Sequence, residues 1–502
     1  MGLLRQSFLE AHPMVRSRDV VRVLVALIVA ALTSAPAPGQ QSPAPADATM
    51  SVDPAALDKA VASLRNADLA KLSKEQLEAK AEEIDQAWKL IVAAGPVGLA
   101  RLKQELKALD QAKQPDPFFR LGAGVLLWQL AKLDAADLIA EQWRQAPLTL
   151  NYNYVFYTAF DAAKTQDARA VPLLKACLAD NEGSIFVAMH FMRVQWPLTH
   201  QFLWGAYGSK GLPVLAEILE TSKNLVELKS ALVLLTMSHA AEALPTIRQL
   251  TKHEDGDLRR HAVRALGEFG HPDDYAALMA GLKSTDPEDL HAYVFALYEY
   301  GDLRCVADVA PLLKSPHDEV RREVLATLKH LVCPASLEAL ECWSREALTD
   351  EEKTECREYV VKRLEDAKLT WDAYQAKSPD ERRAIAARLR ATNEERFVLK
   401  KDDRRMTHDE LLAAAKEWKE RHRLDGGTFE WAEDRHVLSA ATPADLDLLR
   451  DIEAALYWRL SDECLYEVRT IHGLIRRLGR SRYRAEVDQT EKVAPPAATK
   501  KL

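Results

Sequence analysis

The sequence predicts an all-α fold: an α-solenoid of repeated helical hairpins, followed by a small C-terminal α+β/helical module. Four segments of the chain can be aligned, and their anchor residues Leu228, Leu258, Leu290 and Val320 lie 30, 32 and 30 residues apart. Within each segment apolar residues recur every three or four positions, the period of a helix with one buried face. A period near 30 residues with two helices per unit indicates units that bury their apolar faces against their neighbours.

The first residues of the chain have the pattern of an export signal. Arg16, Arg18 and Arg22 precede an apolar run over residues 23–31, and small residues follow. A basic start, a short apolar core and small residues before a cut are typical of a secretory signal peptide. We therefore predict a signal peptide over residues 1–39 and an exported protein, periplasmic or secreted. The apolar run is shorter than the about 20 residues of a membrane span, so an uncleaved membrane anchor is the alternative.

The next segments are predicted in chain order. Residues 40–72 begin with Pro, Ala, Gln and Ser and are expected to form a flexible spacer. A capping pair, Ser73 and Gln76, opens the N-terminal helical hairpins of residues 73–150. The hairpin repeats then occupy residues 151–345, and a charged helical connector occupies residues 346–394.

The second aligned segment carries a family resemblance. Its residues 258–274 read "LRRHAVRALGEFGHPDD". They resemble HEAT repeats of the phycobilisome-lyase type, whose first helix has Val-Arg, two variable residues, Ala and then Ala-Leu-Gly. The resemblance is clear over about residues 224–345 and implies an α-solenoid. It does not specify a function, because HEAT repeats occur in scaffolds, adaptors and a few enzymes.

An aromatic-rich stretch over residues 184–214 departs from the repeat. Trp196, Trp204 and Tyr207 in this stretch are candidate contacts to a protein partner. The alternative is that these rings fill the space between neighbouring repeats, because large aromatic side chains are mostly buried.

A different region begins at residue 395 and is expected to end near residue 485. The alternating segments 397–401 and 428–440 predict short strands. Capping residues at Thr442 and Ser461 predict a helical hairpin. We expect the tail, residues 486–502, to be disordered.

Residues 469–484 contain six arginines and no acidic residue. Arg476, Arg477 and Arg480 are therefore candidate contacts to an anionic envelope surface or an acidic partner. The alternative is a helix C-terminus whose dipole favours cations, followed by a solvated tail.

No catalytic, cofactor-binding or metal-binding residue is predicted. The HEAT-repeat enzyme deoxyhypusine hydroxylase holds two irons with His-Glu pairs ahead of the Ala-Leu-Gly element, whereas this chain has Arg260 and His261 there. The chain has one His-Glu pair, His253 and Glu254, and two irons need several converging ligands. His261 is expected to be a surface or inter-repeat residue, and no nucleophile or phosphate-binding motif occurs.

Six cysteines without a CxxC pair exclude a zinc ribbon. Export would permit a disulfide among Cys333, Cys342 and Cys356, and buried free thiols are the alternative.

These observations predict an exported, non-enzymatic scaffold or binding protein whose solenoid surface contacts a protein partner. The formal net charge of -8 and the export signal argue against a nucleic-acid partner. The alternative function is a cell-envelope enzyme or enzyme subunit with its site in the C-terminal module or the groove beside it.

Overall fold

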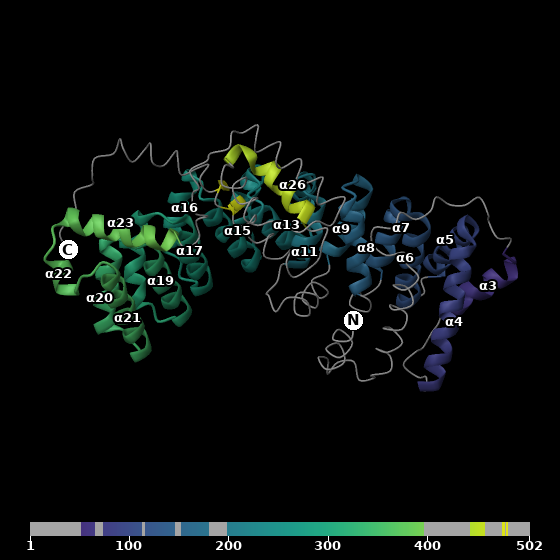
Figure 1. The fold of residues 1–502 in the computed structure, drawn as a ribbon, viewed down its shortest axis with the longest axis horizontal. Helices are drawn as coiled ribbons and strands as arrows, with labels where there is room; N and C mark the ends of the chain where they lie inside the picture. Colours follow the sequence, from purple (N-terminus) through teal and green to yellow (C-terminus); the bar gives the residue numbers. More distant parts are fainter. Residues whose placement is uncertain are drawn as a thin grey trace. The chain divides into compact units, whose positions relative to one another are not determined.

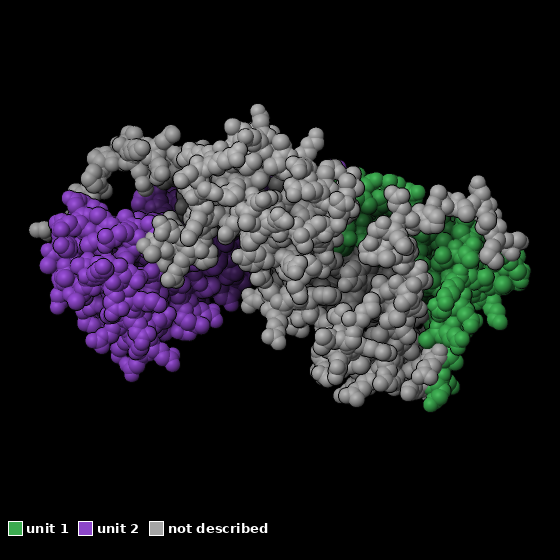
Figure 2. Space-filling view, viewed as in Figure 1, with its two compact units in different colours: residues 1–207 green, residues 208–502 purple. Residues whose placement is uncertain are grey.

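The computed structural model describes residues 52–65, 74–112, 116–145, 152–179, 198–395, 442–456, 474–476 and 478–479. Over these residues every regular element is a helix, so the all-α prediction is confirmed (Figure 1). The chain divides into two compact units, residues 1–207 and residues 208–502 (Figure 2).

The regular elements of the first unit's described residues are helices. They are α3 (Pro54–Ser63), α4 (Lys74–Ala93), α5 (Gly95–Ala112), α6 (Pro117–Ala131), α7 (Ala136–Arg144), α8 (Tyr152–Lys164), α9 (Val171–Leu178) and α11 (Leu198–Tyr207). Helices near in sequence pack together: α3 on α4, α5 on α6, α7 on α9 and α8 on α11. Their contacts bury large side chains such as Trp143 and Phe160.

Helix α3 corrects the prediction of a flexible spacer over residues 40–72. Asp53 accepts a hydrogen bond from the Ala55 backbone N–H, and Pro54 occupies the first turn, where no donor is needed. Leu57 and Val61 are buried on the inner side of this helix. Only residues 40–49 have the composition of a spacer, and the amphipathic residues after them form a helix.

The second unit contains the aligned repeats. Its helices are α12 (Gly211–Thr221), α13 (Leu225–Met237), α14 (Leu244–Leu250), α15 (Gly256–Phe269), α16 (Tyr275–Gly281), α17 (Pro287–Tyr300), α18 (Val306–Val309), α19 (Asp318–His330), α20 (Pro334–Glu346), α21 (Asp350–Asp366), α22 (Trp371–Gln375), α23 (Pro379–Glu395) and α26 (Leu446–Leu456). The first helices of the repeats are α13, α15, α17 and α19, and they pack against one another in that order (Figure 1). All four anchor residues are buried.

The first helices begin and end at comparable positions. Asp255 accepts a hydrogen bond from the Leu258 N–H at the start of α15, and Asp286 does the same for α17. Gly270 and Gly301 end these two helices in the left-handed conformation, with φ of 65° and 78°. His239 adopts a φ of 47° after the end of α13. The chain therefore reverses its direction at equivalent positions in successive repeats.

The stacking continues beyond the predicted end of the repeats at residue 345. Helix α21 packs on α20, and Tyr359 of α21 donates a hydrogen bond to the Lys329 carbonyl oxygen of α19 at 2.5 Å. Residues 350–366 therefore extend the stack and are not a separate connector.

The C-terminal module is described in part. The predicted strands over residues 397–401 and 428–440 lie outside the described residues. The predicted cap at Thr442 is confirmed, because its backbone N–H and hydroxyl donate to the Asp445 carboxylate at 2.8 and 2.7 Å ahead of α26. Within the described part of the chain, no helix is long and apolar enough to cross a membrane.

Candidate functional site

Basic residues link each repeat to the next along the first helices. The residue after each anchor is Lys229, Arg259, His291 or Arg321, and each faces an acidic residue of the following first helix or of α21. The distances are 2.6 Å from Lys229 Nζ to Asp257 Oδ2, 2.9 Å from Arg259 Nη2 to Asp289 Oδ2, 3.4 Å from His291 Nε2 to Glu323 Oε2 and 2.9 Å from Arg321 Nε to Glu352 Oε1. We call this series the polar ladder.

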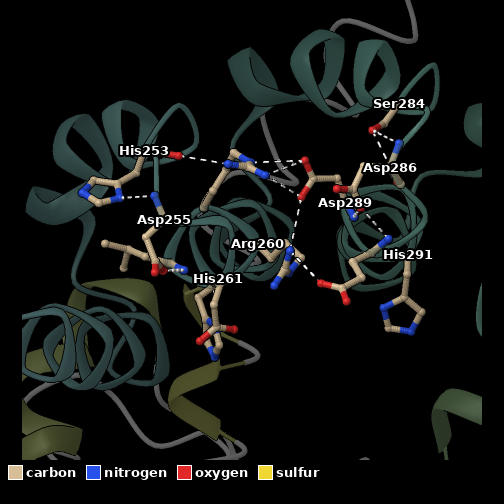
Figure 3. Close-up of polar contacts among 12 residues, drawn as sticks. His253, Asp255, Arg260, His261, Ser284, Asp286, Asp289 and His291 are labelled. Atoms are coloured by element: carbon tan, nitrogen blue, oxygen red, sulfur yellow. Dashed lines mark hydrogen bonds and ion pairs between the residues drawn. The ribbon is translucent and has the colours of Figure 1, made fainter.

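The centre of the ladder lies between α15 and α17 (Figure 3). Arg260 Nη1 contacts Glu288 Oε2 at 2.8 Å, and Arg259 also donates to the His253 carbonyl oxygen at 3.1 Å. Partly exposed pairs of this kind each contribute little free energy of folding. They recur at equivalent positions of successive repeats.

The histidines on this surface have structural contacts. His261 Nδ1 lies 2.8 Å from the Asp257 carbonyl oxygen, one turn earlier in α15, and can donate to it. His253 Nδ1 accepts from the Asp255 N–H at 3.0 Å and shapes the turn before α15. In the residues that the structure describes, no group of three or more His, Cys, Asp or Glu side chains could hold a metal ion. His261 is a partly exposed residue of the repeat surface, as predicted.

Arg264 differs from the residues of the ladder. It lies six residues after its anchor, where the other repeats have Leu234, Ala296 and Ala326. It forms no ion pair with a described carboxylate, its Nε is buried without a hydrogen bond, and its guanidinium stands over the Phe295 ring at 5.5 Å. Burial lowers the pKa of Arg264, and the negative charge of Glu323 opposes that shift. The positive charge of Arg264 therefore stands at a position that is apolar in the other repeats.

Three repeats meet at Arg264. Its Nη2 lies 3.4 Å from His291 Nδ1, and His291 Nε2 lies 3.4 Å from Glu323. Because a guanidinium can only donate, His291 Nδ1 accepts and the ring proton resides on Nε2, which faces the carboxylate. Arg264 of α15, His291 of α17 and Glu323 of α19 thus form a polar relay across successive repeats.

Aromatic side chains continue this surface. Phe295 and Tyr298 stack with ring centroids 6.0 Å apart, and Tyr298 lies 4.4 Å from the His330 ring. Phe295 and Tyr298 are half-buried and His330 is exposed. We call the surface formed by the following residues the Arg264 face: Arg264, His291, Phe295, Tyr298, Glu323 and His330.

A second polar surface is formed by the C-terminal ends of the first helices. Arg450 of α26 donates to the Ser238 carbonyl oxygen at 2.9 Å and to the His239 carbonyl oxygen at 3.0 Å, just after the C-terminal end of α13. Arg390 of α23 donates to the Gly301 carbonyl oxygen at 3.3 Å. Cations at these carbonyls are favoured by the helix dipole.

Arg476 contacts the same surface. Its Nε and Nη2 bind the Glu268 carboxylate, and Nη2 lies 2.7 Å from Glu299 Oε2. Burial acts to lower the pKa of Arg476, but the two carboxylates outweigh it and raise the pKa. We define the helix-end edge as Ser238, His239, Glu268, Glu299 and Gly301.

The predicted partner contacts fall into three groups: buried residues, a residue paired within its own chain, and residues whose side chains are not described. Trp204 and Tyr207 are 4% and 3% exposed on α11, which packs on α8 and α9, so they are core residues and not partner contacts. Arg476 binds carboxylates of its own chain. Trp196, Arg477 and Arg480 lie outside the residues whose side chains are described.

Two of the described cysteines are buried thiols of the core. Cys305 is fully buried, and burial raises its pKa to about 12, while Cys356 has a pKa raised to about 11 by the same cause. Both are neutral thiols at physiological pH. Cys305, Cys333, Cys342 and Cys356 are free thiols.

Comparison with known proteins agrees with this architecture. The family model for HEAT repeats matches residues 212–290, which contain α12 to α16 and the first turn of α17. These residues form HEAT repeats, as their sequence predicted, and the regular elements of the described residues are all helices. A solved structure described as an engineered protein is 16% identical, covers 75% of this chain and 99% of its own, and gives a TM-score of 0.27, too low to indicate a shared fold. The search of curated proteins found no match.

Sequence reasoning missed both surfaces. Arg264 could have been found, because it is the charged residue at a position that is Leu or Ala in the other aligned repeats. The pairing of Arg476 with Glu268 joins residues 208 positions apart, and no local pattern signals it.

Proposed function

We propose that this chain is an exported, non-enzymatic HEAT-repeat scaffold that binds an acidic segment of a partner protein through the Arg264 face. HEAT repeats commonly serve protein binding, and the matched segment includes Arg264. The observation that carries the proposal is the charge of Arg264, which no described carboxylate neutralises by direct contact.

The chemistry of Arg264 selects the ligand. A guanidinium held against an aromatic ring presents planar donors that match a carboxylate. Arg264 lies over Phe295 and is partly withdrawn from water, which strengthens a new charge-assisted hydrogen bond. Glu323, the carboxylate of this face, contacts His291 instead. An aspartate or glutamate of a partner would supply the missing charge.

The surroundings of Arg264 resemble the centre of a protein interface. Arginine and aromatic side chains are enriched at the residues that dominate binding energy. Phe295 and Tyr298 are half-buried side by side, and His330 extends the surface onto α19. A peptide crossing these helices would contact three repeats in turn.

The export part of the proposal is supported by the basic and apolar residues of the first 39 positions. An exported scaffold would meet its partner in the cell envelope or outside the cell. Acidic segments of proteins are available in both places.

Photo-cross-linking in intact cells tests the proposal. A photoreactive phenylalanine replaces Tyr298 in one tagged variant and the exposed Val361 of α21 in a control. We expect one discrete protein to be linked at position 298 and not at 361, and the captured chain to begin at Gln40. Equal products at both positions, or none at 298, would contradict the proposed surface. A captured chain that still begins at residue 1 would contradict the predicted cleavage and leave the proposed surface untouched.

A further inference from the structure

The segment that covers the helix-end edge has the properties of a bound ligand. Within residues 442–479, the described side chains that are buried include Leu446, Leu449 and Ile475. The polar contacts of the described residues with the rest of the chain include those of two arginines, Arg450 and Arg476. Apolar residues combined with arginine on one side are characteristic of an amphipathic helix that binds a surface groove.

The edge supplies complementary groups at repeated positions. Glu268 and Glu299 each lie two residues before the glycine that ends their helix, so the repeat places two carboxylates next to each other. Arg476 bridges them. At α13, the preceding repeat, the equivalent end offers backbone carbonyls, and Arg450 binds those of Ser238 and His239. The edge therefore binds arginine by two means, carboxylates and helix-end carbonyls.

The fit at the edge is close. A Cβ added to Gly479 would lie 2.5 Å from Cγ of the His239 ring, so only glycine allows the backbone to approach this ring. Ser209, just ahead of α12, donates to Asp451 of α26 at 2.9 Å. The described residues of the segment therefore contact residues ahead of α12, at the end of α13, in α15 and in α17.

We propose that the helix-end edge is a binding site for an amphipathic helix that carries arginines, and that the described residues 442–456, 474–476 and 478–479 occupy it as an exchangeable ligand within the chain. The contacts join parts of the sequence 177 to 242 residues apart, so the covalent link raises the local concentration of the segment at its site. A separate helix of the same chemistry then competes with a tethered occupant. This proposal concerns a surface other than the Arg264 face and does not depend on it.

Peptide exchange on the full chain tests this proposal. A protease recognition sequence is inserted between Glu395 and Thr442, and the chain is tested before and after cleavage. The probe is a fluorescent peptide of residues 442–485, and its binding is followed by anisotropy in low salt. We expect the cleaved chain to exchange its own segment for the peptide, and the uncleaved chain to bind the peptide about tenfold more weakly or less.

Substitutions then identify the groups that bind. Glu268→Gln and Glu299→Gln in the cleaved chain are expected to weaken peptide binding about tenfold each, as are Arg450→Gln and Arg476→Gln in the peptide. Glu288→Gln, at the other end of α17 in the ladder, is the matched control and should leave binding unchanged.

Three results would overturn the proposal. The first is a cleaved chain that never exchanges its segment with a large excess of peptide. The second is loss of helical circular dichroism when the segment leaves, because the segment would then be an integral part of the fold. The third is equal binding by the Glu268→Gln, Glu299→Gln and unaltered chains.

Discussion

Gly267 of α15 lies directly against Ala296 of α17. A Cβ at position 267 would stand 2.2 Å from the Ala296 carbonyl oxygen and 2.5 Å from its Cα. Both neighbours are backbone atoms of a buried helix, so they cannot turn aside as a side chain could. The absence of a side chain at Gly267 thus sets the separation of two successive first helices.

Gly267→Ala should destabilise the repeats, although alanine favours a helix more than glycine does. The overlap with α17 should cost about 2 kcal/mol or more, against a gain of about 1 kcal/mol in helix propensity. Gly122→Ala in α6 is the control, because an added Cβ there would have its closest neighbour, Trp88 Cζ3, 4.0 Å away. Urea unfolding should show a lower midpoint for Gly267→Ala only. A midpoint equal to that of the unaltered chain would refute the close approach.

Glu352→Gln should destabilise the chain by about 3 kcal/mol. Arg321 and Glu352 are 5% and 6% exposed, so removing the carboxylate charge leaves a buried guanidinium with less compensation. Glu351, exposed in the same turn of α21, provides the control, and Glu351→Gln should change stability by less than about 0.5 kcal/mol. Thermal unfolding monitored by calorimetry measures both. Equal effects would mean that the ladder does not extend to α21.

The cap at Asp255 should make part of the stability depend on pH. The hydrogen bond from the Leu258 N–H, helped by Lys229, lowers the pKa of Asp255. A lowered folded pKa contributes stability that is present above the unfolded pKa of about 3.9 and is lost as the pH falls through the folded value. Asp255→Ala should therefore cost about 1 kcal/mol at pH 7 and progressively less below pH about 4. Asp308→Ala, at an exposed position that caps no helix, should show no such trend in urea unfolding.

Thiol labelling should follow burial. In a Cys464→Ser variant, an alkylating reagent at pH about 8 should modify exposed Cys342 first. Cys305 should react last, because burial raises its pKa to about 12 and little thiolate is present. Peptide mass spectrometry measures the order. Early labelling of Cys305 in the native chain would contradict its position in the core.

The repeats were predictable because their information is local. Leu258, Ala262 and Phe269 recur with the helical period, and Gly270 marks the end of the helix, so one alignment of the chain with itself predicts the fold. The extension to α21 was not predictable in the same way. Its link to α19 uses the ion pair of Arg321 with Glu352. Glu352 lies among many charged residues, so no periodic apolar pattern marks it in the sequence.

The candidate surfaces were less accessible from sequence. Trp204 and Tyr207 were predicted to contact a partner because they are large aromatic residues. Large aromatic side chains are also mostly buried, and both of these are. Arg476 drew attention within an arginine-rich run, but its partners Glu268 and Glu299 belong to helices far away in the sequence. Long-range contacts depend on how the segments meet in the fold.

The most direct test of the account is the affinity of the cross-linked partner for variants of the Arg264 face. Arg264→Gln is compared with Arg322→Gln, which removes an exposed arginine of α19 that pairs with Asp318 in its own helix. Biolayer interferometry with purified proteins gives both Kd values, and circular dichroism checks the fold. The account predicts that Arg264→Gln raises the Kd about tenfold or more while Arg322→Gln changes it less than about twofold. An unchanged Kd for a folded Arg264→Gln variant would contradict it.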